Sequence, residues 1–205
     1  MDDAIFQQRA SERPFNFADV VAPMPLGFKR IKQDDMIEMG GRTWDVHIGN
    51  GHAPEHATFR SRDDNLVLSG DQILPSISSN IGVYATEPEA DPVADWLESC
   101  ERLALLARDD QLLLGGHKLP FTGAPTRMRQ LIDNHHGALE RLKKHPTKPQ
   151  TAAECFPPLF KRTIEGSAYG LASVEALAHL NHLYHVGEVS RTVRDDGALL
   201  WQRLD

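Results

Sequence analysis

Hydrophobic and polar residues alternate over several short stretches in the first part of the chain, which is typical of half-buried β-strands. The stretch "MIEMGGRTWDVHI" predicts two strands joined at Gly40 and Gly41, and "HATFRS" with "NLVLSG" predicts a second hairpin around "RDDN". Farther on, "QLLLGGH" predicts a fully buried strand that ends at Gly115 and Gly116. The segment "DQILPSISSNIGVYATEPEADP" has no regular pattern and is expected to be a long loop.

Apolar residues at helical spacing predict two helices that cover these strands. The first begins at Pro92 and would bury Trp96, Cys100 and Leu103. The second covers "PTRMRQLIDNHHGALERLKKH" and ends before Pro146. A short helix is also expected in "DDAIFQQRA", near the start of the chain. Paired strands followed by covering helices predict an α+β protein with helices layered on a sheet.

The composition of the chain changes at "PTKPQ", residues 146–150, which predicts two domains, 1–147 and 148–205. The second domain would contain a short helix near "AAECF" and a longer one in "SVEALAHLNHLYHVG". Two short strands, "EVSRTVR" and "ALLWQRL", would follow around the turn "DDG". Helices followed by a β-hairpin predict a small winged-helix-like domain.

The composition of the chain limits the cellular compartments and the classes of binding partner that we expect. The 205 residues are 40% hydrophobic and 25% charged, so the chain can bury a core, and the formal net charge of −7 argues against broad binding to nucleic acid. Cys100 and Cys155 form no CxxC motif, which fits a reducing compartment. Neither a signal-peptide pattern nor a long apolar run is present in the sequence. We therefore expect a cytoplasmic protein without a membrane partner.

Three polar residues share the same predicted structural position. His52, Asp71 and His117 each follow a predicted strand and a glycine. Side chains at the ends of neighbouring strands face a common rim, where loops gather. Two imidazoles and one carboxylate are ligands that zinc and similar metals accept, and a carboxylate can bridge two ions. These three residues are therefore candidate metal ligands.

The stretches "GHAPEHATF", "LVLSGDQILP" and "LLLGGHKLPF" resemble the second half of metallo-β-lactamase-fold hydrolases. The resemblance implies the second half of a four-layer αβ/βα sandwich followed by a winged-helix-like tail. It implies that His52 binds a first metal, His117 a second, and Asp71 both, with two Zn²⁺ ions per site and iron or manganese as alternatives. It assigns no side chain to catalysis, because a metal-bound hydroxide would attack a small ester, thioester or lactone.

The family also uses an HxHxDH motif for the remaining ligands, and the present sequence lacks it; its first histidine is His47. Met1 resembles an internal methionine of a longer protein, so a truncated or split gene product is expected. Two ligands per ion should bind metal weakly, and the chain alone should be inactive. The uncovered sheet face would then need a homodimer or a partner chain.

Two other functions remain open from the sequence. One is a non-catalytic binding or oligomerisation module, or a remnant, which the absence of HxHxDH favours. The other is a ribonuclease, since some similar proteins with such a tail cut RNA. Residues 151–205 contain more acidic than basic side chains, so nucleic acid is not the expected partner.

Several other polar residues are candidates for a supporting role. His56 starts a strand and is expected to hydrogen-bond the loop or to orient a ligand. Ser79 and Asn80 follow Asp71 in the long loop and are expected to bind a substrate oxygen, with an ordinary polar surface loop as the alternative.

For two groups of histidines on predicted helices, the sequence favours ordinary structural roles over metal binding. His135 and His136 are adjacent, so both are solvated, or one is packed and the other exposed. His179, His182 and His185 are expected to form a polar face of the tail, because no carboxylate or cysteine completes a metal site with them and the helical turns rotate the outer two apart.

Overall fold

The computed structural model describes residues 7, 10–11 and 16–204 and divides the chain into two units, Met1–Ile31 and Lys32–Asp205. The helix expected in "DDAIFQQRA" falls largely outside the described residues. The first unit contains one short 3-10 helix, η1 (Phe17–Asp19), among the residues described in it. The second unit holds the sheet, the longer helices and every candidate site residue.

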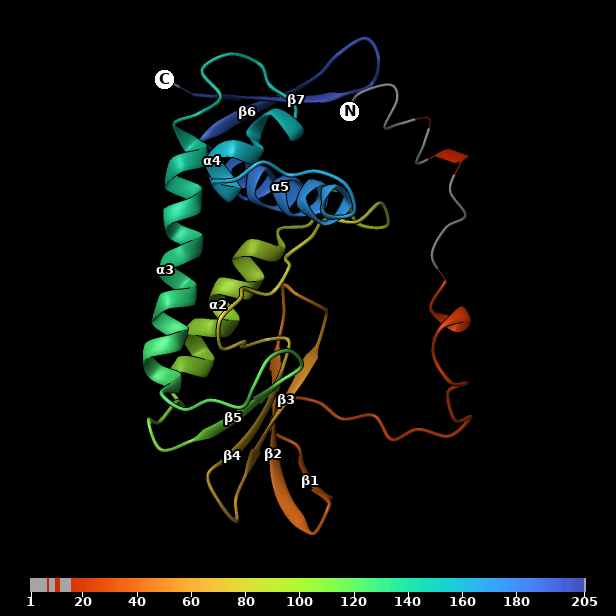
Figure 1. Ribbon diagram of the computed structural model, residues 1–205, viewed down its shortest axis with the longest axis vertical. Helices are drawn as coiled ribbons and strands as arrows, with labels where there is room; N and C mark the ends of the chain where they lie inside the picture. The colour runs from red at the N-terminus through yellow and green to blue at the C-terminus, as the bar shows by residue number, and fades with distance from the viewer. Residues whose placement is uncertain (1–6, 8–9, 12–15, 205) are drawn as a thin grey trace. The chain divides into compact units, whose positions relative to one another are not determined.

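The second unit is built on a five-stranded sheet (Figure 1). The strands occur in spatial order as β1 (Met36–Met39), β2 (Arg42–Gly49), β3 (His56–Ser61), β4 (Leu66–Gly70) and β5 (Leu112–Gly115). The first three pairings are antiparallel, and β5 pairs parallel to β4. Both predicted hairpins and the long irregular loop after β4 are confirmed.

Strand β5 is less buried than the sequence indicated. Leu113 is buried, but Leu112 is 41% exposed. The strand lies at an edge of the sheet, where one side pairs with β4 and the other makes a single bridge to Phe121. The expectation of a fully buried strand is therefore wrong, because an apolar run does not distinguish a central strand from an edge strand.

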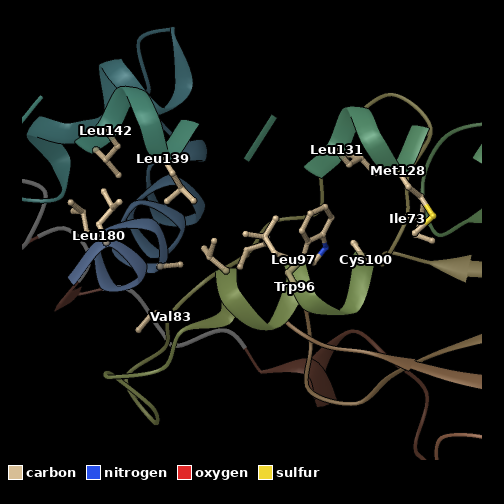
Figure 2. Close-up of a cluster of buried hydrophobic side chains, with 14 of the residues drawn as sticks. Ile73, Val83, Trp96, Leu97, Cys100, Met128, Leu131, Leu139, Leu142 and Leu180 are labelled. Atoms are coloured by element: carbon tan, nitrogen blue, oxygen red, sulfur yellow. The ribbon is translucent and has the colours of Figure 1, made fainter. Parts of the chain in front are cut away.

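Helices α2 (Pro92–Ala104) and α3 (Ala124–Lys143) are confirmed and supply much of the core. Asp91 caps the start of α2, where its side chain accepts a hydrogen bond from the Ala94 backbone amide at 3.0 Å. Figure 2 shows the side chains of these helices in one buried cluster together with Ile73 of the long loop and Leu180 of the tail. The cluster joins the sheet, the helices and the tail in one core.

The tail contains η2 (Ala153–Cys155), α4 (Phe156–Phe160), α5 (Ala168–His185) and the hairpin of β6 (Val189–Val193) and β7 (Leu199–Arg203). The predicted elements are present, and the α+β class is confirmed. Helix α5 contacts both α2 and α3, so the tail shares its core with the preceding part. The boundary at residues 147 and 148 and the winged-helix assignment stay predictions. No helix in the described part of the chain has the length and apolar character needed to cross a membrane.

Candidate metal centre

His52, Asp71 and His117 meet at one edge of the five-stranded sheet. The Nε2 atom of His52 lies 3.6 Å from Asp71 Oδ2, and the Nε2 atom of His117 lies 3.4 Å from the same oxygen. The pairings of the sheet explain why they meet: β2, β4 and β5 run in the same direction, so the loops that follow them leave from the same edge. The sheet thus brings together three residues that are far apart in the sequence.

The spacing of these atoms suits metal ligands. Two ligand atoms on one tetrahedral zinc ion, each about 2.1 Å from the metal, are about 3.4 Å apart. One carboxylate oxygen that faces two imidazoles is also the arrangement of a ligand that bridges two ions. In the described part of the chain, however, no three His, Cys, Asp or Glu side chains form a metal-binding group. The three residues therefore supply a partial ligand set, in which both imidazoles approach the same oxygen of Asp71.

The ring of His52 is held in one orientation by the long loop. Its Nδ1 atom lies 2.8 Å from the backbone carbonyl oxygen of Asn80. Because a carbonyl oxygen only accepts, Nδ1 is the donor, and in the neutral ring the lone pair is on Nε2, which faces Asp71. A lone pair that faces a carboxylate requires a proton or a cation between the two atoms. A metal ion between His52 Nε2 and Asp71 Oδ2 would fit this geometry.

His56 supports the backbone of Asp71 and does not contact its carboxylate. The Nε2 atom of His56 accepts a hydrogen bond from the Asp71 backbone amide at 3.2 Å. Burial lowers the pKa of His56, and the nearby His52 lowers it further, so the ring stays neutral and can accept this bond.

The glycines before Asp71 and His117 leave space for the site. A Cβ atom on Gly70 would lie 2.5 Å from Cε1 of His56, and a Cβ on Gly116 would lie 2.3 Å from Oδ1 of Asp71. That Oδ1 atom is buried and has no hydrogen-bond partner among the described residues. Both glycines are therefore required by close approach to the candidate ligands.

Ser79 and Asn80 hold the loop that carries Asp71. Ser79 is 2% exposed, and its hydroxyl donates a hydrogen bond to the Asp71 carbonyl. Asn80 contacts His52 through its backbone carbonyl, and its side-chain amide donates to Glu175 Oε2 at 2.8 Å. The predicted contact of these two residues with substrate stays a prediction.

Glu175, on helix α5, is a residue of this region that the sequence did not identify. Burial raises its pKa to about 7, although the hydrogen bond from Asn80 and the charge of Arg162 act in the opposite direction. Through Asn80, Glu175 connects the tail to the ring of His52. A single carboxylate within the apolar sequence "SVEALAHL" was the available signal.

His135 of α3 and His179 of α5 form a buried pair, and His179 lies one helical turn after Glu175. His135 Nδ1 lies 3.1 Å from His179 Nε2, and His179 Nδ1 lies 2.8 Å from the Glu175 carbonyl oxygen. Burial lowers the pKa of both rings. His135 is packed while His136 is exposed, which is one of the two alternatives considered for them. The expectation that His179 lies on a polar face is wrong, because α5 packs this side against α3.

A carboxylate also lies beside the other two histidines of α5. Asp91 Oδ2 is 3.0 Å from His182 Nδ1 and 3.6 Å from His185 Nδ1. The expectation that no carboxylate accompanies these histidines is wrong, because Asp91, which precedes α2, lies 91 positions before His182 and meets it only through the packing of the two helices. This cluster of two imidazoles and one carboxylate links the start of α2 to the end of α5, and it is not arranged as a metal-binding group in the described residues.

Comparisons with known proteins agree with this architecture. Residues 139–204 match the family model described as "Metallo-beta-lactamase-like, C-terminal domain". A β-lactamase domain protein from Burkholderia ambifaria is 38% identical with a TM-score of 0.90, over 100% of this chain and 58% of its own chain. A metallo-β-lactamase family protein from Thermus thermophilus is 28% identical with a TM-score of 0.77, over 98% of this chain and 63% of its own. This chain therefore spans less than two thirds of the length of either protein.

Proposed function

Because the chain belongs to the metallo-β-lactamase-fold superfamily, with the architecture of the second half of its sandwich, we propose that it is part of a metal-dependent hydrolase. One observation carries this proposal: Asp71 Oδ2 lies within 3.6 Å of His52 Nε2 and within 3.4 Å of His117 Nε2. Hydrogen bonds orient the ring of His52 and hold the backbone of Asp71.

His52, Asp71 and His117 are the residues that would hold the metal, with Zn²⁺ as the first choice and iron or manganese as alternatives. Bound metal would polarise the scissile carbonyl and make water nucleophilic near neutral pH. Asn80 fixes the ring of His52, while His56 and Ser79 fix the backbone on either side of the Asp71 side chain. We propose a small ester, thioester or lactone as substrate, in part because a chain with a net charge of −7 offers little attraction to RNA.

The second candidate is a non-catalytic binding or oligomerisation module. It is favoured by the absence, among the described residues, of any three side chains arranged as a metal-binding group. For either function we propose a cytoplasmic location, which the free, buried thiols of Cys100 and Cys155 support. A second copy or a partner chain that covers the sheet is also part of the proposal.

Titration of the chain with Zn²⁺, followed by calorimetry, and with Co²⁺, followed by visible absorption, tests the proposal. We expect saturable but weak binding by the unmodified chain, because each ion would have two protein ligands. His117→Ala should weaken binding about tenfold or more. The matched control is His136→Ala, which removes an exposed histidine of α3 and should leave binding unchanged. Unaltered binding by His117→Ala contradicts the site, and no binding by the unmodified chain supports the second candidate.

A further inference from the structure

A cleft of about 600 Å³ lies between the long loop, helix α3 and the first turns of α5. Its lining combines the polar side chains of Asn80, Gln130 and Asn134 with the apolar side chains of Leu131, Ile164 and Leu171. A smaller hollow of about 210 Å³ adjoins it and shares Ser78, Asn134, Phe160 and Glu175. A concave site of this size, with apolar walls and a few polar groups, is typical of small-molecule binding.

The charge of the cleft differs from that of the chain. Its lining and that of the adjoining hollow include four cationic side chains, Arg127, Arg141, Lys161 and Arg162, and the carboxylate of Glu175. The whole chain, in contrast, has a net charge of −7. Cations gathered in a concave site of an acidic protein create a local field that attracts anions.

None of these four cations forms an ion pair with a carboxylate in the described part of the chain, although the charge of Arg162 acts on the nearby Glu175. Elsewhere six arginines form ion pairs with Asp or Glu: Arg42, Arg62, Arg102, Arg108, Arg191 and Arg194. No ion pair between described residues involves Arg127, Arg141, Lys161 or Arg162. Their charge is therefore available to a ligand.

Two of these guanidinium groups are fixed in place by backbone carbonyls. Arg127 donates to Leu74 at 2.7 Å and to Ile77 at 2.9 Å, both in the loop that follows Asp71. Arg141 donates to the carbonyl of Gly137 at 2.7 Å and to that of Pro158 at 2.9 Å. Neutral carbonyls orient a guanidinium without cancelling its charge, which prepares the site for an anion.

We propose that this cleft binds an amphipathic organic anion, namely an apolar chain or ring that carries a carboxylate or phosphate group. Arg127 and Arg162 attract the anionic group, and Leu131, Ile164 and Leu171 contact the apolar part. A cleft with apolar walls favours a small molecule over RNA, which binds along open basic grooves with stacking aromatic side chains. Asn80 belongs both to the cleft and to the network of His52, so under the proposed hydrolase function the ligand is the anionic part of the substrate. That last step rests on the proposed function; the binding itself does not.

Binding of octanoate and octyl phosphate to the metal-free full chain, measured by calorimetry, tests the inference, with octanamide as the uncharged analogue. We expect saturable binding of at least one anion. Octanamide should bind at least about tenfold more weakly, because it cannot form the charge-assisted hydrogen bonds. Arg162→Glu should weaken anion binding about tenfold or more. Arg162 is exposed, so the variant should fold. The matched control, Arg129→Glu, makes the same charge change on an exposed position of α3 outside the cleft and should retain binding.

A second variant tests the apolar wall. Leu171→Gln removes apolar surface from a side chain that is already 59% exposed, so it should fold and weaken octanoate, octyl phosphate and octanamide alike. The ratio of octanoate to octyl phosphate affinity identifies the preferred anionic group.

Three results would overturn the inference: no saturable binding of either anion, equal losses in Arg162→Glu and Arg129→Glu, or octanamide binding as tight as that of the anions. The cleft would be assigned to nucleic acid instead if single-stranded RNA binds more tightly than either octyl anion and Arg162→Glu abolishes that binding. Because the measurement needs no metal, anion binding without Zn²⁺ uptake leaves this inference standing while the hydrolase proposal fails, and the reverse result does the opposite.

Discussion

The carboxylate of Asp71 is positioned by its surroundings but is poorly satisfied within the protein. Its backbone amide donates to His56 and its carbonyl accepts from Ser79, so the residue is fixed on both sides. Its Oδ1 atom is buried without a partner among the described residues, and its Oδ2 atom faces the Nε2 atoms of two imidazoles. Such an arrangement costs stability in the absence of a cation, which is common where residues are arranged for function.

Asp71→Asn should therefore stabilise the metal-free chain at about pH 8. The amide can donate to an imidazole lone pair, and we expect a gain of about 1 kcal/mol in the free energy of unfolding. Urea unfolding in the presence of a chelator measures it, and the same variant should bind Zn²⁺ more weakly. A loss of stability in Asp71→Asn would show that the carboxylate is satisfied without a metal.

Gly116 gives a second prediction at this scale. In Gly116→Ala the new Cβ would lie 2.3 Å from Asp71 Oδ1, so the carboxylate must move. We expect about 1–3 kcal/mol of destabilisation and weaker Zn²⁺ binding, measured by urea unfolding and calorimetry.

The matched control is Gly137→Ala on α3, where the nearest atom to the new Cβ is Arg141 Nη1 at 3.4 Å. Alanine favours the helix over glycine by up to about 1 kcal/mol, so this variant should be neutral or more stable, with Zn²⁺ binding unchanged. Equal behaviour of the two alanine variants would contradict the assigned role of Gly116.

Among the elements, helix α5 connects the tail to the candidate metal centre. Glu175 accepts the amide of Asn80, whose carbonyl holds His52, and the Glu175 carbonyl accepts from the buried His179. The tail therefore helps to hold the candidate metal centre, and substitutions in α5 that remove the Glu175–Asn80 contact should alter the position of His52.

The pH dependence of stability tests the state of Glu175. Its pKa is raised from 4.5 to about 7, so the folded chain binds this proton more tightly than the unfolded chain. The stability that this group contributes is present below about pH 4.5 and is lost as the pH rises to about 7. Glu175→Gln keeps an oxygen acceptor for Asn80 and removes the titration. The stability of this variant relative to the unmodified chain should therefore increase between about pH 5 and about pH 8.

Urea unfolding at several pH values within this range measures the difference. The contributions of His135 and His179, whose pKa values are lowered, have the opposite sign and cancel when the two proteins are compared. Glu165→Gln, at an exposed position, is the control and should show no such trend. A difference for Glu175→Gln that is constant with pH would show that the carboxyl group titrates normally.

The sequence predicted the elements well because their signals are local. The periodicity of β2, β3, α2 and α3 lies within each segment. His52, Asp71 and His117 each follow a strand and a glycine, and this shared pattern indicated that they would meet. The contacts that it missed join distant segments: Asn80 with Glu175 across 95 positions, and Asp91 with His182 across 91. Such contacts depend on how elements pack, which local patterns do not encode.

At the scale of the second unit, the five-stranded sheet has two apolar faces. Val67 and Leu113 point into the core shared with α2 and α3. Val46, Phe59, Leu68 and Leu114 are paired in register across four strands and therefore share the opposite face. Phe59, Leu68 and Leu114 are only partly buried. A sheet with two apolar faces needs a layer on each.

The similar proteins of known structure have longer chains, of which this chain covers 58% and 63%. We propose that in this chain the second face is covered by another copy of itself or by a partner chain. Sedimentation equilibrium measures self-association, which should be concentration-dependent.

Leu112→Lys is the variant that tests this face. Leu112 lies on the edge strand β5, two residues from Leu114 and so on the same face, and it is 41% exposed. A buried ammonium would oppose association, so we expect the dissociation constant of a homodimer to rise about tenfold or more, with little change in the stability of the monomer. Leu105→Lys introduces the same charge at an 87% exposed leucine after α2, off the sheet, and should leave association unchanged. Equal effects of the two lysines would place the contact elsewhere. An unmodified chain that is monomeric at every concentration would rule out the second copy and leave a partner chain as the layer that the apolar face requires.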